Sequence, residues 1–251
     1  MSSLRTTHHP ATADVAAAFA AYLCAGIGIA FPVGRDGGSG ALALGAGAAV
    51  LAGACGSILR RTDPSCSPAD RVTLARAVLA ACCAVLTTAA LLGGQPAGFP
   101  LVAVGTAAFV LDAVDGPVAR RTGTASADGA RLDTATDAAL TLVLACAAAG
   151  RLGVWALLPG LLYYAFTAAG RLRPSLRRPL PGSAIRKAIG AFQPGALLFA
   201  LLPGVPPATA TAAALAALAL LLFSFGRDVA ALERLRTKDP SAAQAPLTPR
   251  G

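Results

Sequence analysis

Eight apolar segments are candidates to cross a lipid bilayer, and they leave little of the chain for anything else. They cover about 13–33, 39–59, 72–93, 97–119, 132–150, 153–170, 188–204 and 207–226. A membrane-crossing helix needs about 20 mainly apolar residues, and inside lipid its backbone must satisfy its own hydrogen bonds. The sequence therefore predicts an all-α, polytopic transmembrane helical bundle.

The kind of apolar residue refines this prediction. Only 13% of residues are charged, whereas about a quarter are charged in a typical soluble domain. Alanine and glycine are abundant among the apolar residues, and such small side chains let membrane helices approach closely. A tightly packed bundle is expected.

Positive charge predicts the orientation. Of the 21 lysines and arginines, 18 lie in the N-terminal tail, near 60–71, 120–131 and 171–187, or after 226. Because cytoplasmic loops of membrane proteins carry this excess, we expect these loops and both termini on the cytoplasmic side of a cell membrane. The segment 13–33 is read as a retained helix rather than a cleaved signal sequence, because Arg5 is the only positive charge before it.

The net charge of +9 has the same origin, with attraction to anionic lipid headgroups added. Nucleic acid binding would need a soluble basic face, so no nucleic acid partner is expected.

Five of the 12 acidic residues fall between 112 and 137. Asp112 and Asp115 are three residues apart near the end of one apolar segment and so share a helix face. Gly129, Asp133 and Asp137 follow at intervals of four and form one stripe on the next helix. A short turn between these helices would bring four carboxylates together near the cytoplasmic end of the bundle.

An isolated aspartate at mid-membrane costs about 2.5 to 3.5 kcal/mol on insertion scales, and four close together also repel one another. Their clustering predicts a cation among them. Carboxylate oxygens suit Mg²⁺, Mn²⁺ or Ca²⁺ rather than zinc. Asp128 is instead expected in a solvated turn, where Thr124 or Ser126 can cap the following helix.

The same residues carry a resemblance. Asp112, Asp115, Gly116, Ala119, Arg120, Gly129, Asp133 and Asp137 fit the whole of the pattern D-x2-D-G-x2-A-R-x8-G-x3-D-x3-D. This pattern resembles the signature of the CDP-alcohol phosphotransferase (CDP-alcohol phosphatidyltransferase) family. The resemblance implies a six-helix catalytic core over 68–226. It leaves two additional helices in 1–67 and a cytoplasmic tail at 227–251, which we expect to be disordered.

The resemblance also implies an activity. A CDP-linked lipid such as CDP-diacylglycerol would transfer its phosphatidyl group to an acceptor alcohol and release CMP. Asp112, Asp115, Asp133 and Asp137 would hold divalent cations, Mg²⁺ or Mn²⁺, two per site, and Asp137 would also be the general base. Gly116, Ala119, Arg120 and Gly129 would lie against the CDP-lipid. Homodimers are expected by the same resemblance.

The stretch "RVTLARAVL" at 71–79 resembles the first core helix of that family. Thr73 and Arg76 share one face of it and are candidate contacts to the CDP-lipid. The family more often has an asparagine shortly before the threonine, where this chain has Asp70. A buried arginine in a membrane segment is a functional candidate, but snorkelling of Arg76 to the interface is the alternative.

The identity of the acceptor alcohol is the feature of the reaction that the sequence constrains least. Six cationic side chains between 171 and 187 could bind a phosphorylated acceptor such as glycerol phosphate or inositol phosphate. Arginine in particular can form two parallel hydrogen bonds to a phosphate. The candidates are Arg171, Arg173, Arg186 and Lys187. Cytoplasmic positive charge explains the same run equally well.

Two rival functions remain. Intramembrane carboxylates also occur in transporters and proton relays, although such proteins are typically built from repeated halves, and no repeat is evident here. A family member that has lost activity would be expected to lack part of the motif, and no position is missing.

Overall fold

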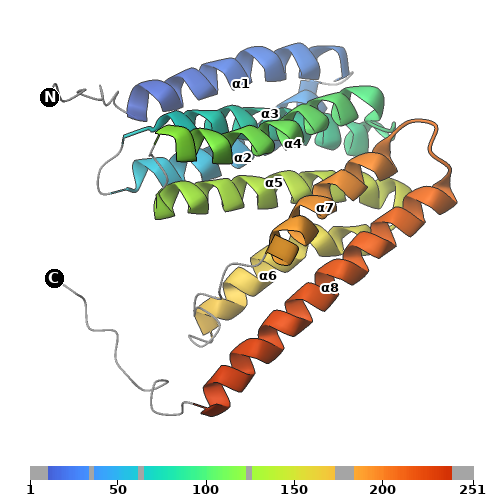
Figure 1. Ribbon diagram of the computed structural model, residues 1–251. Coiled ribbons are helices and arrows are strands. Elements are labelled where there is room, and N and C mark those ends of the chain that lie inside the picture. Colours follow the sequence, from blue (N-terminus) through green and yellow to red (C-terminus); the bar gives the residue numbers. More distant parts are fainter. Residues whose placement is uncertain (1–10, 34–36, 62–64, 123–125, 173–183, 239–251) are drawn as a thin grey trace, which may run out of the picture.

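The computed structural model describes residues 11–33, 37–61, 65–122, 126–172 and 184–238, and every element in these ranges is a helix. The elements are α1 (Ala11–Val33), α2 (Gly37–Leu59), α3 (Pro68–Gly93), α4 (Gly98–Thr122), α5 (Ala127–Leu152), the 3₁₀ turn η1 (Val154–Leu157), α6 (Leu158–Leu172), α7 (Ala184–Leu201) and α8 (Pro207–Lys238) (Figure 1). The predicted all-α, polytopic bundle is confirmed.

Five of these helices are long and apolar enough to cross a membrane: α1, α2, α3, α5 and α8. The remaining apolar stretches in the described ranges are shorter, at Gly98–Asp112, Val154–Ala165 and Ala188–Leu201. Each of them falls within one of the eight segments predicted above. The protein is therefore a multi-pass membrane protein whose helices differ in apolar length.

Two predicted boundaries are wrong. The helix expected to end at 226 continues as α8 to Lys238, so residues 227–238 are helical rather than part of a disordered tail. This segment is rich in good helix formers such as alanine, leucine and arginine. The single helix expected over 153–170 is instead divided into η1 and α6, following Gly153, whose φ of 99° is unfavourable for any other residue.

Helix α3 is the centre of the bundle. It packs against α1, α2, α4 and α5, and 67% of its apolar window is buried, compared with at most 39% in the other long spans. Figure 1 shows α1 to α5 running alongside one another, with α6, α7 and α8 inclined across them. A side chain on α3 can therefore reach several neighbouring helices.

The additional helices α1 and α2 pack tightly against this centre. Tyr22 of α1 is fully buried, and its hydroxyl donates a hydrogen bond to the backbone carbonyl of Leu44 in α2. Gly47 of α2 faces both Tyr22 and α3, and a Cβ at Gly47 would lie 2.7 Å from the backbone oxygen of Ala81. The contact requires a glycine because the opposing atom belongs to a helix backbone that cannot yield.

Replacing this glycine should therefore destabilise the bundle. We expect Gly47→Ala to lower the free energy of unfolding by about 1 to 3 kcal/mol, as overpacking does. Gly45→Ala on the same helix is the matched control, since a Cβ there meets nothing within 4 Å and alanine favours helix by up to about 1 kcal/mol. Thermal unfolding in detergent compares the two variants, and equal stability would contradict the packing described.

Candidate active site

The candidate site lies on two consecutive helices, α4 and α5. Ser126 is the N-cap of α5, and its hydroxyl accepts a hydrogen bond from the backbone nitrogen of Gly129 at 2.9 Å. The cap confirms Ser126 as one of the two capping candidates, while Thr124 lies outside the described residues. Asp128 lies in the exposed first turn, where it pairs with Arg131 at 3.1 Å.

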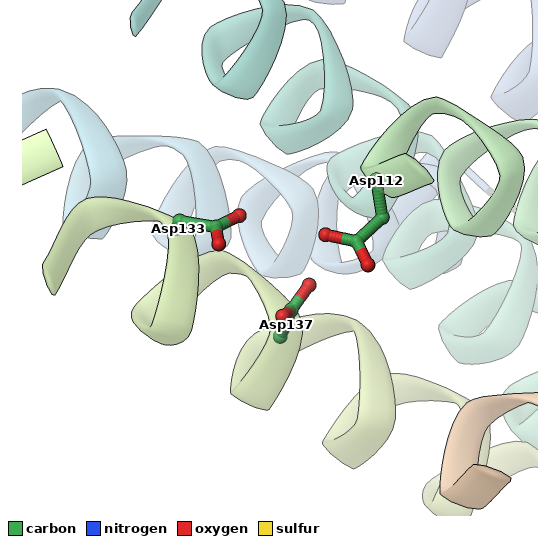
Figure 2. A group of neighbouring side chains, drawn as sticks. All are labelled: Asp112, Asp133 and Asp137. Atoms are coloured by element: carbon green, nitrogen blue, oxygen red, sulfur yellow. The ribbon is translucent and has the colours of Figure 1, made fainter. Parts of the chain in front are cut away.

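Three carboxylates converge between the two helices. Asp112 comes from α4, and Asp133 and Asp137 come from successive turns of α5, with their side chains directed toward a common point (Figure 2). One oxygen of each lies within 4.8 Å of the others. Their side chains retain between 32% and 45% exposure, so the cluster is open on one side.

Arg76 reaches this cluster from α3. Its guanidinium is 2.8 Å from a carboxylate oxygen of Asp112 and also forms ion pairs with Asp133 and Asp137. The side chain is only 1% exposed. The snorkelling alternative is therefore wrong, because the arginine turns inward to three carboxylates rather than outward to the interface.

The net negative charge of this group favours binding of a divalent cation. Among the described side chains, one guanidinium offsets only one of three negative charges, and each carboxylate remains partly exposed. Their oxygens are the hard ligands that Mg²⁺ and Mn²⁺ prefer. The donor set therefore fits such an ion, which would be held by Asp112, Asp133 and Asp137.

The other motif residues are placed only in part. Asp115, Gly116, Ala119 and Arg120 lie on helix α4, but their side chains are outside the described part of the structure. A Cβ on Gly129 would lie 3.0 Å from the capping oxygen of Ser126, so this glycine also makes room for the cap.

The family follows from a comparison with known proteins. A family model described as CDP-alcohol phosphatidyltransferase matches residues 68–230, more than half of the chain. The chain belongs to this family. Comparisons with curated proteins and with solved structures give no match.

As a CDP-alcohol phosphatidyltransferase family member, the chain is of a type that transfers a phosphatidyl group from a CDP-alcohol. The matched region begins with α3 and includes α4 and α5, the helices that carry the aspartates. Thr73, a predicted contact to the nucleotide lipid, is buried on α3, and its hydroxyl donates to the backbone carbonyl of Ala69 at 3.1 Å. Its hydroxyl proton is thus already engaged within the helix.

Sequence reasoning missed an ion pair at the start of the region that the family model matches. Asp70 is 4% exposed and pairs with both terminal nitrogens of Arg61, at 2.9 and 3.0 Å. It also completes a capping box with Ser67 at the start of α3. The sequence signal was the Ser-x-x-Asp spacing, a variant of the capping box. The hydrogen bond to Asp70 raises the pKa of Arg61 above its ordinary value.

This ion pair and a second one connect α1 and the end of α2 to α3, the helix that carries Arg76. Asp14 of α1 pairs with Arg71 of α3 at 3.2 Å, and Arg61, just beyond α2, pairs with Asp70 of α3. We expect Arg61→Ala to lower the free energy of unfolding by about 1 to 3 kcal/mol, because it leaves a buried carboxylate with fewer partners.

Arg131→Ala is the matched control, since its pair with Asp128 is exposed and exposed pairs contribute at most about 1 kcal/mol. Thermal unfolding of the two variants in the same detergent makes the comparison. A larger loss for Arg131→Ala would contradict the importance of the buried pair.

The predicted acceptor residues fall where little is described. Arg173 lies outside the described residues, and the side chains of Arg171 in α6 and of Arg186 and Lys187 in α7 are not described either. Gln193, the glutamine that follows Lys187 in the sequence, is 3% exposed and donates to the backbone carbonyl of Ala217 in α8 at 2.7 Å. That glutamine joins two helices.

Proposed function

We propose that the protein transfers a phosphatidyl group from a CDP-linked lipid such as CDP-diacylglycerol to an acceptor alcohol and releases CMP. One observation carries the proposal: Asp112, Asp133 and Asp137 converge from two helices around one buried arginine, in a chain of the CDP-alcohol phosphatidyltransferase family. With divalent cations bound, such a site would hold the diphosphate of a nucleotide-activated lipid.

The metal ligands of the proposal are Asp112, Asp115, Asp133 and Asp137, with Mg²⁺ or Mn²⁺ as the ion and two ions per site. When bound, such ions neutralise phosphate oxygens and stabilise the charge that develops during phosphoryl transfer. Arg76 supplies a further fixed positive charge within the same group and holds the three carboxylates together through its ion pairs.

The chemical step forms a bond between the acceptor oxygen and the lipid-bearing phosphorus, and it breaks the bond from that phosphorus to the oxygen of CMP. Asp137 accepts the proton of the acceptor hydroxyl, as a general base within hydrogen-bond reach would. CMP leaves with the bonding electron pair. Atoms and charge balance without any other reactant.

The remaining residues of the proposal surround this centre. Gly116, Ala119, Arg120, Gly129 and Thr73 lie along the CDP-lipid, and the acceptor is held by Arg171, Arg173, Arg186 and Lys187. We propose a catalytic core at 68–226 preceded by two additional helices in 1–67. The site and both termini face the cytoplasm, and the protein is a homodimer in a cell membrane.

The test is CMP release by purified protein from CDP-diacylglycerol with Mg²⁺. Glycerol phosphate, inositol phosphate, serine and phosphatidylglycerol are supplied in parallel as acceptors. We expect release with one of them and none after chelation of the metal. Ion-gradient-driven uptake of a solute without CMP release would contradict the proposal and support a transporter instead.

A further inference from the structure

A cavity opens at the end of the bundle away from the aspartates. It has a volume of about 690 Å³ and lies between the α3–α4 turn, the end of α5 and the α7–α8 turn. Ligand-binding cavities typically measure about 300 to 1,000 Å³. Its lining residue Ala147 follows Asp137 by ten residues, which is about 15 Å along a helix, so the cavity is separate from the carboxylate site.

The cavity wall is apolar along the helices and polar at its mouth. Leu91, Leu101 and Leu201 line it on three different helices, whereas Gln95 lies in the exposed turn after α3. This gradient matches an amphiphile whose chain runs between the helices and whose head lies at the membrane surface.

A buried hydroxyl in the wall lacks a partner. Thr87 of α3 lines the cavity and is 4% exposed, yet its hydroxyl oxygen makes no hydrogen bond. Thr73 and Thr136, two other buried threonines on helices, both donate to the carbonyl four residues earlier. Because an unsatisfied buried polar group costs about 1 to 3 kcal/mol, Thr87 points to a ligand that supplies a hydrogen bond.

The charge of the mouth selects the class of ligand. Of the described residues that line the cavity, Arg151 alone is charged. Its guanidinium donates to the backbone carbonyls of Ala200, Leu202 and Val205 around the end of α7. These three bonds leave some of its five N–H donors available, and no carboxylate lining the cavity offsets its charge.

We propose that this cavity binds one anionic membrane lipid, with an acyl chain between the helices and the head group at Arg151 and Gln95. Arg151 ends the membrane-spanning segment of α5, which is the depth of a lipid head group. Phosphate accepts charge-assisted hydrogen bonds from arginine, and an ester carbonyl of the lipid gives Thr87 an acceptor. The ligand thereby bridges α3, α5 and the α7–α8 turn.

The test uses phosphatidylglycerol with a photoactivatable acyl chain, added to the full-length protein in a neutral detergent. Cross-linked peptides are identified by mass spectrometry, so labelling of this cavity is distinguished from labelling of the carboxylate site. We expect labelling of peptides that contain Leu91 or Ala147. Unlabelled phosphatidylglycerol should compete about 10-fold better than phosphatidylcholine, because the choline cation offsets the phosphate charge that Arg151 contacts.

Matched variants test the cavity itself. Ala147→Phe fills the space and should reduce this labelling about 10-fold, because close-packed walls cannot accommodate both ring and chain. Ala107→Phe places the same ring on the exposed surface of α4 and should leave labelling unchanged. Thr87→Val, which preserves the packing, should weaken binding about 3- to 10-fold through loss of one hydrogen bond.

Three results would overturn the proposal. Labelling that is confined to other peptides would show that the cavity binds no lipid. Equal labelling of Ala147→Phe and Ala107→Phe would show that the volume is not used. Competition by phosphatidylcholine as strong as that by phosphatidylglycerol would show that the site does not select an anionic lipid. If Ala147→Phe does not fold, lipid binding by Thr87→Val tests the cavity instead, and unchanged binding by that variant would contradict the proposal.

Discussion

Asp137→Asn should lower the rate of CMP release by at least about 1,000-fold, within the range attributed to general acid–base catalysis. Asparagine has nearly the same shape as aspartate but cannot take a proton from an acceptor hydroxyl. It also removes one of the three neighbouring carboxylate charges of the site. Turnover is measured as CMP release, and binding of CDP-diacylglycerol is measured separately, since binding should be largely retained.

Asp128→Asn is the control for this variant. Asp128 lies on the same helix, is exposed, and pairs only with Arg131 among the ion pairs described for it. Its replacement should leave turnover within about two-fold, because exposed pairs contribute little. Near-normal turnover in Asp137→Asn would remove the proposed base and leave the transfer to be explained by another residue.

Arg76→Met should make the stability of the protein dependent on divalent cations. The substitution keeps an unbranched side chain but leaves Asp112, Asp133 and Asp137 without the buried guanidinium that contacts all three. Removing one partner of a buried ion pair destabilises by about 3 to 5 kcal/mol. For a protein of this size that corresponds to a fall in Tm of roughly 10 °C.

Magnesium should reverse most of this loss, because an ion that binds only the folded state stabilises it. Thermal unfolding in detergent with chelator and then with millimolar Mg²⁺ measures the recovery. Arg131→Met, which removes an exposed arginine, is the control and should show neither the loss nor the recovery. A fall in Tm that Mg²⁺ does not reverse would mean that the carboxylates need the arginine but hold no metal.

The sequence was sufficient for the class of fold and for the convergence of three of the four aspartates. Apolar length and spacing predicted helices, because the bilayer permits few other structures. The intervals of three and four residues between aspartates predicted one carboxylate face on each helix. The structure brings Asp112, Asp133 and Asp137 together, whereas the side chain of Asp115 lies outside the described part of the chain. These inferences succeeded because they depend on helix periodicity, which is a local property of the chain.

Long-range contacts could not be predicted in the same way. The sequence placed Arg76 within an apolar segment but could not distinguish an arginine that snorkels from one that reaches carboxylates on two other helices. The pair between Arg61 and Asp70 joins a loop after α2 to the start of α3 and leaves no periodic signal. The end of α8 was missed because hydropathy detects membrane segments rather than helices that continue beyond them.

We propose that the converging carboxylates hold a cation that binds a diphosphate. Electron paramagnetic resonance of Mn²⁺ bound to the purified protein tests this proposal most directly. We predict that Mn²⁺ binds, and that adding CDP-diacylglycerol produces a phosphorus hyperfine coupling. Asp112→Ala should weaken both signals, whereas Asp128→Ala should leave them intact. Mn²⁺ that binds equally well to Asp112→Ala, or that shows no phosphorus coupling with the lipid present, would contradict the account.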